Sequence, residues 1–182
     1  MRPLLLAYVV AVATLLTLCD WACHVRQGVL VYPQPISYEW LSGQPTPAVF
    51  LLFFTCTSVG VVLGRARLRE RVRVGLAGTL VAVVVFVAAY WASGRFAAHP
   101  LALSLAFVGV WQAQVALAQR RAELIGFSLV LALAGTLIEA VVSSTGFFAY
   151  VRPDVLGVPM WLPALYLAGA PAAVATLGLA DA

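Results

Sequence analysis

The stretch TLIEAVVSSTGFFAYVRPDVLGVPMWLPALYLAGA, residues 136–170, decides the fold of this chain. Its beginning closes one apolar segment, its end opens another, and two glycines and two prolines interrupt the loop between them. Glycine and proline end helices and form turns, so the stretch predicts two helices joined by an ordered loop. Glu139 falls inside the first apolar part, where an unpaired charge is costly, which makes it a candidate functional residue.

Four successive pieces of this stretch, TLIEAVV, GFFAY, RPDV and MWLPALYLAGA, resemble the C-terminal part of the Insig family in order and spacing. Two earlier pieces, YWASGR (90–95) and LALSLAFVGVW (101–111), extend the resemblance back to about residue 85. Insigs are small polytopic membrane proteins that regulate sterol metabolism. The resemblance implies a six-helix bundle without catalysis, an oxysterol-like lipid bound within the membrane, and regulation of a larger membrane protein through helix contacts.

The resemblance also places partner contacts on Gln119 and Arg120, at the end of the fourth apolar segment. Gln119 replaces an aspartate that Insigs need for function, whereas Arg120 keeps the family's arginine. A family tryptophan pair corresponds to Val115 and Ala116, and a sterol-facing glutamine corresponds to Ala102. These departures remove contacts for a sterol hydroxyl, so the expected ligand is either a sterol-like lipid or a diacylglycerol-like one.

Composition alone indicates an integral membrane protein. The chain has 182 residues, of which 63% are hydrophobic and 10% charged, and its mean hydropathy is +1.00. The formal net charge of +4 does not indicate nucleic-acid binding, because all the basic residues are arginines and most stand in loops between apolar segments. The dominance of Ala, Val, Leu, Gly and Arg is consistent with a GC-rich bacterial genome, and we expect a bacterial inner membrane.

We predict an all-α fold, a single domain of six transmembrane helices over residues 1–182. The expected spans are 3–25, 46–63, 74–92, 100–118, 124–142 and 160–179, each near the length that crosses a hydrocarbon core. Eight arginines then fall on one side of the membrane, and Arg26, Arg95 and Arg152 fall on the other. Arginine-rich loops stay in the cytoplasm, so both termini are expected there.

Asp20 and His24 stand four residues apart near the end of the first span, on one helical face. Two interpretations remain open: an intramembrane acid with a function, or a pair that caps the helix at the membrane boundary. Cys19, Cys23 and His24 could be drawn as a metal cluster, but no fourth ligand to complete that set is near in the sequence. We therefore expect packing rather than a metal site, and no cofactor.

Lipid binding without catalysis is the function that the sequence favours. Small residues in the third and fifth spans leave room for an apolar ligand between helices, and a few polar or aromatic side chains would orient it. The candidate residues are Asp20, His24, Phe86, Trp91, Trp111, Gln112, Glu139 and Trp161.

An enzyme remains the alternative function. The sequence has no Ser-His-Asp pattern, no HExxH and no phosphate-binding glycine loop. A small membrane enzyme of isoprenoid or lipid metabolism would therefore have to use Asp20 and Glu139 as its acid and base. The expected partner of a binding protein is membrane lipid, and the sequence leaves open a second membrane protein or further copies of the same chain.

Overall fold

A computed structural model describes residues 3–33, 39–67 and 75–180 of the chain. Six α-helices occupy most of the described residues, which confirms the predicted all-α membrane fold. Their bounds are α1 Pro3–Cys19, α2 Thr46–Arg67, α3 Leu76–Arg95, α4 Pro100–Leu117, α5 Arg121–Ser144 and α6 Leu162–Ala180. Much of the predicted arginine-rich loop, residues 68–74, lies outside the described part, as does Arg2.

The apolar helical segments differ in whether they are long enough to cross a membrane. Four helical segments of the described chain are long and apolar enough to cross a bilayer: Pro3–Val25, Leu76–Arg95, Pro100–Leu117 and Arg121–Ser144. The apolar parts of α2 and α6 are shorter, Thr46–Val62 and Leu162–Gly178. The first of the long segments consists of α1 and a six-residue π-helix, η1 (Asp20–Val25), that continues it.

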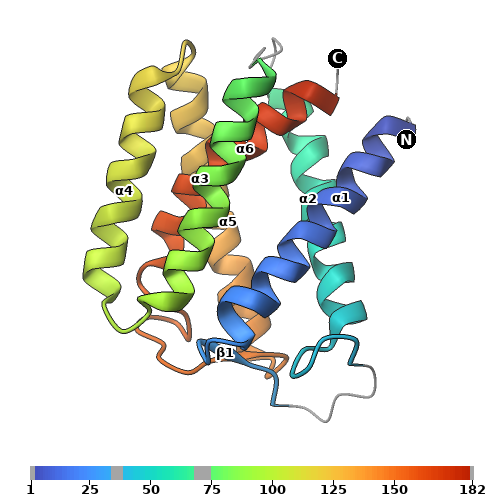
Figure 1. Ribbon diagram of the computed structural model, residues 1–182, viewed down its shortest axis with the longest axis vertical. Helices are drawn as coiled ribbons and strands as arrows, with labels where there is room; N and C mark the ends of the chain where they lie inside the picture. Colours follow the sequence, from blue (N-terminus) through green and yellow to red (C-terminus); the bar gives the residue numbers. More distant parts are fainter. Residues whose placement is uncertain (1–2, 34–38, 68–74, 181–182) are drawn as a thin grey trace.

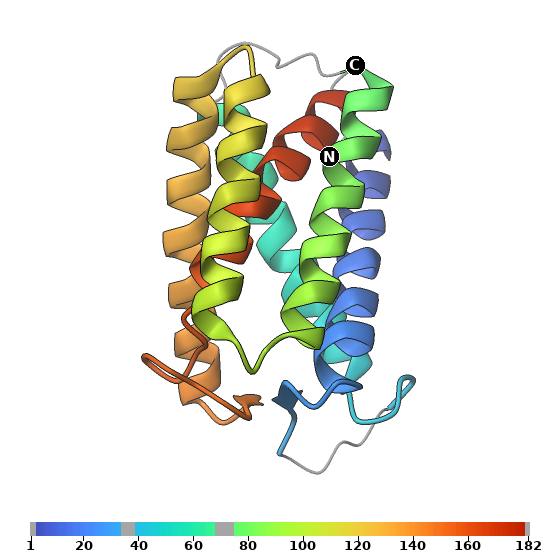
Figure 2. The same ribbon diagram turned by 60° about the vertical axis from the view of Figure 1, so that its left-hand side comes forward.

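Helix α6 is the centre of the bundle. It packs against α3, α4 and α5, and Figure 2 shows it crossing between the α4–α5 pair and α3. Small residues make this possible, because Ala168 and Ala170 on α6 are fully buried and a β-carbon on Gly169 would lie 2.8 Å from the ring of Phe86. Phe86 can therefore pack directly onto the α6 backbone.

The chain termini and the two short strands lie at opposite ends of the bundle (Figure 1). Both chain termini lie at one end, here called the terminal end. The opposite end, the loop end, carries two short strands, β1 (Leu30–Val31) and β2 (Ala149–Tyr150), which pair antiparallel with Leu30 opposite Tyr150. The beginning of α1 and the end of α6 are thus at the same end of the bundle.

Helices α1 and α2 form a pair that meets the rest of the bundle at its two ends. At the loop end, η1 packs against α3. At the terminal end, Tyr8 and Thr176 form a hydrogen bond of 3.0 Å, and a small core joins α1, α2 and α6 through Leu5, Val9, Val61 and Leu177. The large core of the protein is a separate cluster, built mainly around η1, α3, α4, the loop-end strands and α6.

Candidate functional site

Asp20 lies at the start of η1 and is held by two donors from the following loop. It is 4% exposed. The Tyr32 hydroxyl donates to its Oδ2 over 3.0 Å, and the Gln44 amide nitrogen donates to the same oxygen over 2.6 Å. A charge-assisted hydrogen bond is stronger than a neutral one, so the carboxylate fixes the loop that leads from η1 to α2.

His24 stands four residues after Asp20, and its side chain bonds to Ser93 on α3. Its Nε2 lies 2.9 Å from the Ser93 hydroxyl oxygen, and that hydroxyl donates its proton to the Tyr90 carbonyl over 2.6 Å. A serine hydroxyl has one proton, so His24 must be the donor to Ser93, and the network assigns a proton to Nε2. His24 Nδ1 faces Asp20 Oδ1 at 3.8 Å.

His24 is packed among aromatic side chains of the large core. The His24 ring stacks on Tyr90 at 4.7 Å between centroids and lies 5.7 Å from Trp161. π-Helical turns are rare and often mark functional positions. In η1, Asp20 bonds to the loop before α2 and His24 bonds to α3, so this π-helix connects both of them to the first helical segment.

Glu139 on α5 is the second carboxylate of the interior. It accepts hydrogen bonds from the hydroxyls of Tyr150 on β2 and Tyr166 on α6, the latter 2.5 Å long. Tyr166 reaches it because residue 135 is glycine: a β-carbon there would lie 2.6 Å from the Tyr166 ring. Glu139 therefore joins α5 to α6 and to the loop-end strands. The sequence singled out the acid but neither tyrosine.

Aromatic rings connect the two carboxylates. Trp161 is 1% exposed and packs between His24 and Tyr150, whose ring centroid is 6.2 Å from its own. A continuous series of side chains thus runs from Asp20 through His24, Trp161 and Tyr150 to Glu139. The large core at the loop end therefore contains a hydrogen-bonded polar network among its apolar side chains, whereas the terminal-end core is small and apolar.

The tyrosines of the loop end stay protonated donors at neutral pH. Burial raises the pKa of the Tyr32 phenol above its usual range, and the nearby Asp20 carboxylate acts in the same direction. Burial also raises the pKa of Tyr150, with the charge of Glu139 adding to the effect. A phenol that keeps its proton can donate to a carboxylate but cannot act as a base at neutral pH.

One polar group beside Glu139 has no partner. The Thr136 hydroxyl is buried and makes no hydrogen bond to any described residue. Thr136 precedes Glu139 by three positions in α5, so both side chains lie on the same face of that helix. A buried hydroxyl without a partner costs free energy, and a ligand with a polar group would remove this cost.

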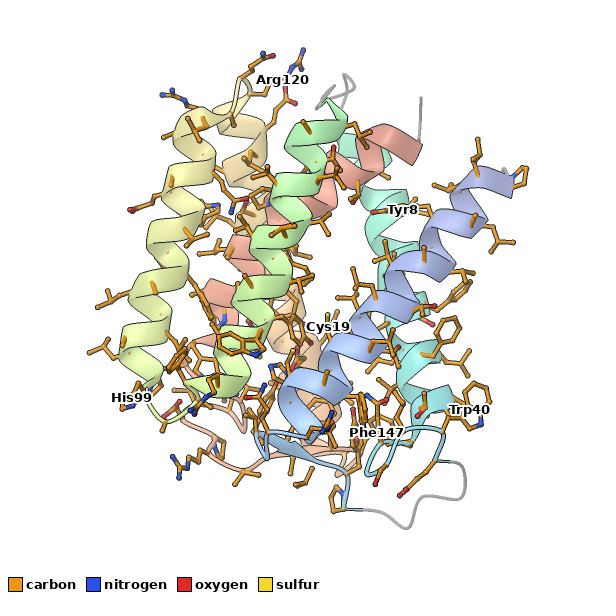
Figure 3. The ribbon with its side chains drawn as sticks, in the orientation of Figure 1. Tyr8, Cys19, Trp40, His99, Arg120 and Phe147 are labelled. Carbon is orange, nitrogen blue, oxygen red and sulfur yellow. The ribbon has the colours of Figure 1, made fainter. Side chains whose placement is uncertain are left out.

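The structure separates the remaining candidates. Phe86 belongs to the interior, with its ring 5.6 Å from that of Tyr90. Trp91 is 51% exposed and contacts Phe96 on the outer surface. Gln119 is exposed and Arg120 half-buried, and Arg120 pairs with Glu123 at the terminal end over 3.0 Å (Figure 3).

The two candidates on α4 have different positions. Trp111 is half-buried, and its indole nitrogen has no partner among the described residues. Gln112 is exposed and lies about two and a half turns after Leu103, on the face of α4 opposite the buried one. Gln114 instead reaches the bundle, donating to the Ala168 carbonyl over 3.3 Å. A lipid contact of Gln112 inside the bundle is therefore not supported.

Cys19 and Cys23 are free thiols that are buried in the large core. In the described ranges, no three His, Cys, Asp or Glu side chains come close enough together to hold a metal ion.

Comparison with known proteins identifies the fold. No protein-family model matches the sequence, and no curated protein matches it. Two crystal structures of MvINS, described as a mycobacterial Insig homologue from Mycobacterium vanbaalenii, are similar. A cross-linked MvINS trimer superimposes with a TM-score of 0.78 at 21% identity, covering 96% of this chain and 94% of that one. A second structure gives 0.72 at 21% identity, covering 94% and 92%. This chain is therefore an integral membrane protein with the fold of a bacterial Insig homologue, as its C-terminal half predicted.

Proposed function

We propose that this protein binds a lipid that carries a free hydroxyl group, diacylglycerol-like or sterol-like, between the α1–α2 pair and the other helices. The protein would hold this lipid without converting it and would act as a sensor of its concentration. The observation that carries the proposal is the pair of polar groups on one face of α5, the unpartnered Thr136 hydroxyl and the Glu139 carboxylate.

The packing supports an apolar ligand at this place. The large core and the terminal-end core are separate clusters, so the α1–α2 pair is secured at its ends and less so between them. An interior normally forms one continuous close-packed core. A lipid chain lying between α2 and α5 would supply the missing apolar contacts, which is the main source of affinity in lipid sites.

The polar groups of Glu139 and Thr136 favour a lipid that carries a hydroxyl group. Each Glu139 oxygen accepts one hydrogen bond from a tyrosine and keeps a second lone pair. A lipid hydroxyl can donate to that carboxylate and accept from Thr136 at the same time, whereas an ester or hydrocarbon cannot donate. Diacylglycerols and sterols both carry such a hydroxyl on a large apolar body.

The enzyme alternative receives less support. It requires Asp20 and Glu139 to exchange protons with a substrate. Asp20 accepts two hydrogen bonds from its own loop, and Glu139 accepts two from tyrosines. Each acid has its own hydrogen-bond donors, and Trp161 packs between His24 on the Asp20 side and Tyr150 on the Glu139 side. These contacts give no support to two acids that converge on one reacting atom, as an acid–base pair must.

A sensor needs an output, and assembly is a suitable one. MvINS has been crystallised as a cross-linked trimer, and we propose that this chain also associates with copies of itself. A lipid that bridges the α1–α2 pair and α5 would change the outer surface that such copies present.

We also propose that both termini lie in the cytoplasm. Fluorescent reporters fused to either end of the chain would test this orientation.

The test is mass spectrometry of the lipids that remain after gentle detergent purification, compared with an unrelated six-helix protein from the same membranes. We expect one class of hydroxyl-bearing lipid to be enriched in this protein. Thr136→Val should lose that enrichment while folding normally, because the hydroxyl has no hydrogen-bond partner among the described residues. Glu139→Gln should weaken it as well.

Two matched controls sharpen the result. Glu123→Gln removes an exposed acid from the same helix, where it pairs with Arg120, and Gln112→Leu changes the outer face of α4. Both should retain the lipid. Equal retention in Thr136→Val and in these controls would refute the site, and a lipid without a hydroxyl would refute the proposed chemistry. Conversion of an added lipid by the wild-type protein alone would favour the enzyme.

A further inference from the structure

A cavity of about 250 Å³ opens at the loop end, away from the Glu139 site. The turn after η1, the end of α3 and the segment after β2 form its walls, and Trp161 contributes to the lining. Its polar side chains are those of Gln27, Arg95 and Arg152, and its lining contains no acidic residue. Two of the three arginines that the sequence placed on this side of the membrane therefore line the same cavity.

The two guanidinium groups have no counter-ion. In the described part of the chain, neither Arg95 nor Arg152 forms an ion pair, and the Arg95 guanidinium lies 6.0 Å from the centre of the Phe96 ring. The acids of this end are occupied elsewhere: Asp154 accepts from the Met160 amide over 2.9 Å, and Glu39 accepts from Gly43. Like charges that line one cavity repel each other, and an anion between them would turn this repulsion into attraction.

We propose that this cavity binds a phosphate group. Arginine presents a planar fork of donors that matches phosphate oxygens two at a time, and Gln27 adds an amide donor. The volume suits a phosphate with a few attached atoms rather than a whole lipid, since pockets for complete ligands are usually larger than about 300 Å³. Gly94 also lines the cavity, and its backbone packs directly against η1.

The phosphate can come from two sources, a phospholipid headgroup at the membrane boundary or a soluble phosphate. Both arginines are exposed, so salt will weaken the binding of a free ion. A headgroup has the advantage that its acyl chains already hold it at the depth of the loop end. The proposal concerns the phosphate group that the two sources share, and the two arms of the experiment separate them.

The first arm measures the thermal unfolding midpoint in detergent, with inorganic phosphate against sodium chloride of equal ionic strength. The second uses native mass spectrometry to compare adducts of phosphatidylglycerol with those of a galactosyl diacylglycerol, which lacks phosphate. Arg152→Gln and the double variant Arg95→Gln/Arg152→Gln should weaken whichever phosphate compound binds by about tenfold or more, the usual effect of losing a charge-assisted hydrogen bond. Arg152 stands outside the helices, so its single variant tests the site without a change in a helix.

Arg26→Gln is the matched control. It removes the third arginine of this end, whose guanidinium lies over the Trp21 ring at 5.1 Å and outside the cavity lining. The control should bind phosphate compounds like the wild type. A response to inorganic phosphate alone would identify a soluble ligand, and phospholipid adducts alone would identify a headgroup. Equal binding in Arg152→Gln, Arg26→Gln and wild type, or no phosphate-specific effect in either arm, would overturn the proposal. Neither result depends on Thr136 or Glu139, so this site and the hydroxyl-lipid site fail or succeed separately.

Discussion

Gly94 on α3 and Cys23 on η1 lie so close that a β-carbon at position 94 would be 1.9 Å from the Cys23 carbonyl oxygen. No side chain fits there, and the atom that it would meet belongs to the backbone. This contact brings Ser93 within reach of His24 over 2.9 Å. The contact between η1 and α3 therefore depends on glycine at position 94.

Gly94→Ala is expected to destabilise the protein by about 2 kcal/mol or more, because overpacking against backbone cannot be relieved by a rotamer change. Thermal unfolding in detergent measures the effect. Gly109→Ala on α4 is the control, since a β-carbon at that position meets nothing within 4 Å. A Gly94→Ala midpoint equal to that of Gly109→Ala would show that η1 and α3 are not in direct contact.

Ser93→Ala is expected to cost about 1–3 kcal/mol, since it leaves the buried N–H of His24 without an acceptor. Ser104→Ala provides the comparison, because the Ser104 hydroxyl bonds only to the Pro100 carbonyl of its own helix over 2.8 Å. The two variants remove the same atom from neighbouring helices. Similar unfolding midpoints would mean that the bond from His24 to Ser93 contributes nothing.

Tyr166→Phe and Tyr150→Phe should each destabilise the protein by about 1.5–3 kcal/mol, the range for hydrogen bonds to a charged group. The two hydroxyls share one carboxylate, so their effects should not add. Comparison of both single variants with the double variant measures the coupling. Strict additivity would contradict a shared Glu139 site. Tyr8→Phe serves as control, because its hydroxyl bonds to the neutral Thr176.

Stability should fall at high pH because of Tyr32 and Tyr150. Burial raises the pKa of both phenols in the folded protein, so above about pH 10 the unfolded chain loses protons that the folded chain keeps. The stabilisation is complete below that pH and is lost as the pH rises, by about 1.4 kcal/mol per pH unit for each phenol. Tyr32→Phe should flatten the slope measured between pH 9 and 11. An unchanged slope would show that Tyr32 is accessible to water.

The sequence predicted the helices well because crossing a membrane leaves the backbone little choice. Lipid offers no hydrogen-bond partners, so each apolar segment must satisfy its own backbone as a helix. The six expected spans correspond to α1 with η1 and α2 to α6. The aromatic and proline-rich loop after α5 also predicted an ordered connection, and β2 and Trp161 lie within it.

The candidate site could be predicted only in part. Glu139, Asp20 and His24 were recognisable because charged or titratable side chains in apolar segments are rare. Their partners were not recognisable, because Tyr150, Tyr166 and Ser93 are ordinary residues of a membrane protein. Gln112 and Gln114 illustrate the same limit. Two glutamines two positions apart look equivalent in the sequence, yet only Gln114 faces α6.

Hydropathy and local helix geometry are properties of each segment alone, so the sequence was sufficient to predict a helical membrane protein, its helical segments and the candidate acids within them. Which side chains contact one another depended on the three-dimensional packing. The pairing of Glu139 with two tyrosines, the approach of Cys23 to Gly94 and the shared cavity of Arg95 and Arg152 all join residues from different elements. Such contacts depend on how helices pack, and packing is set by the fit of whole surfaces.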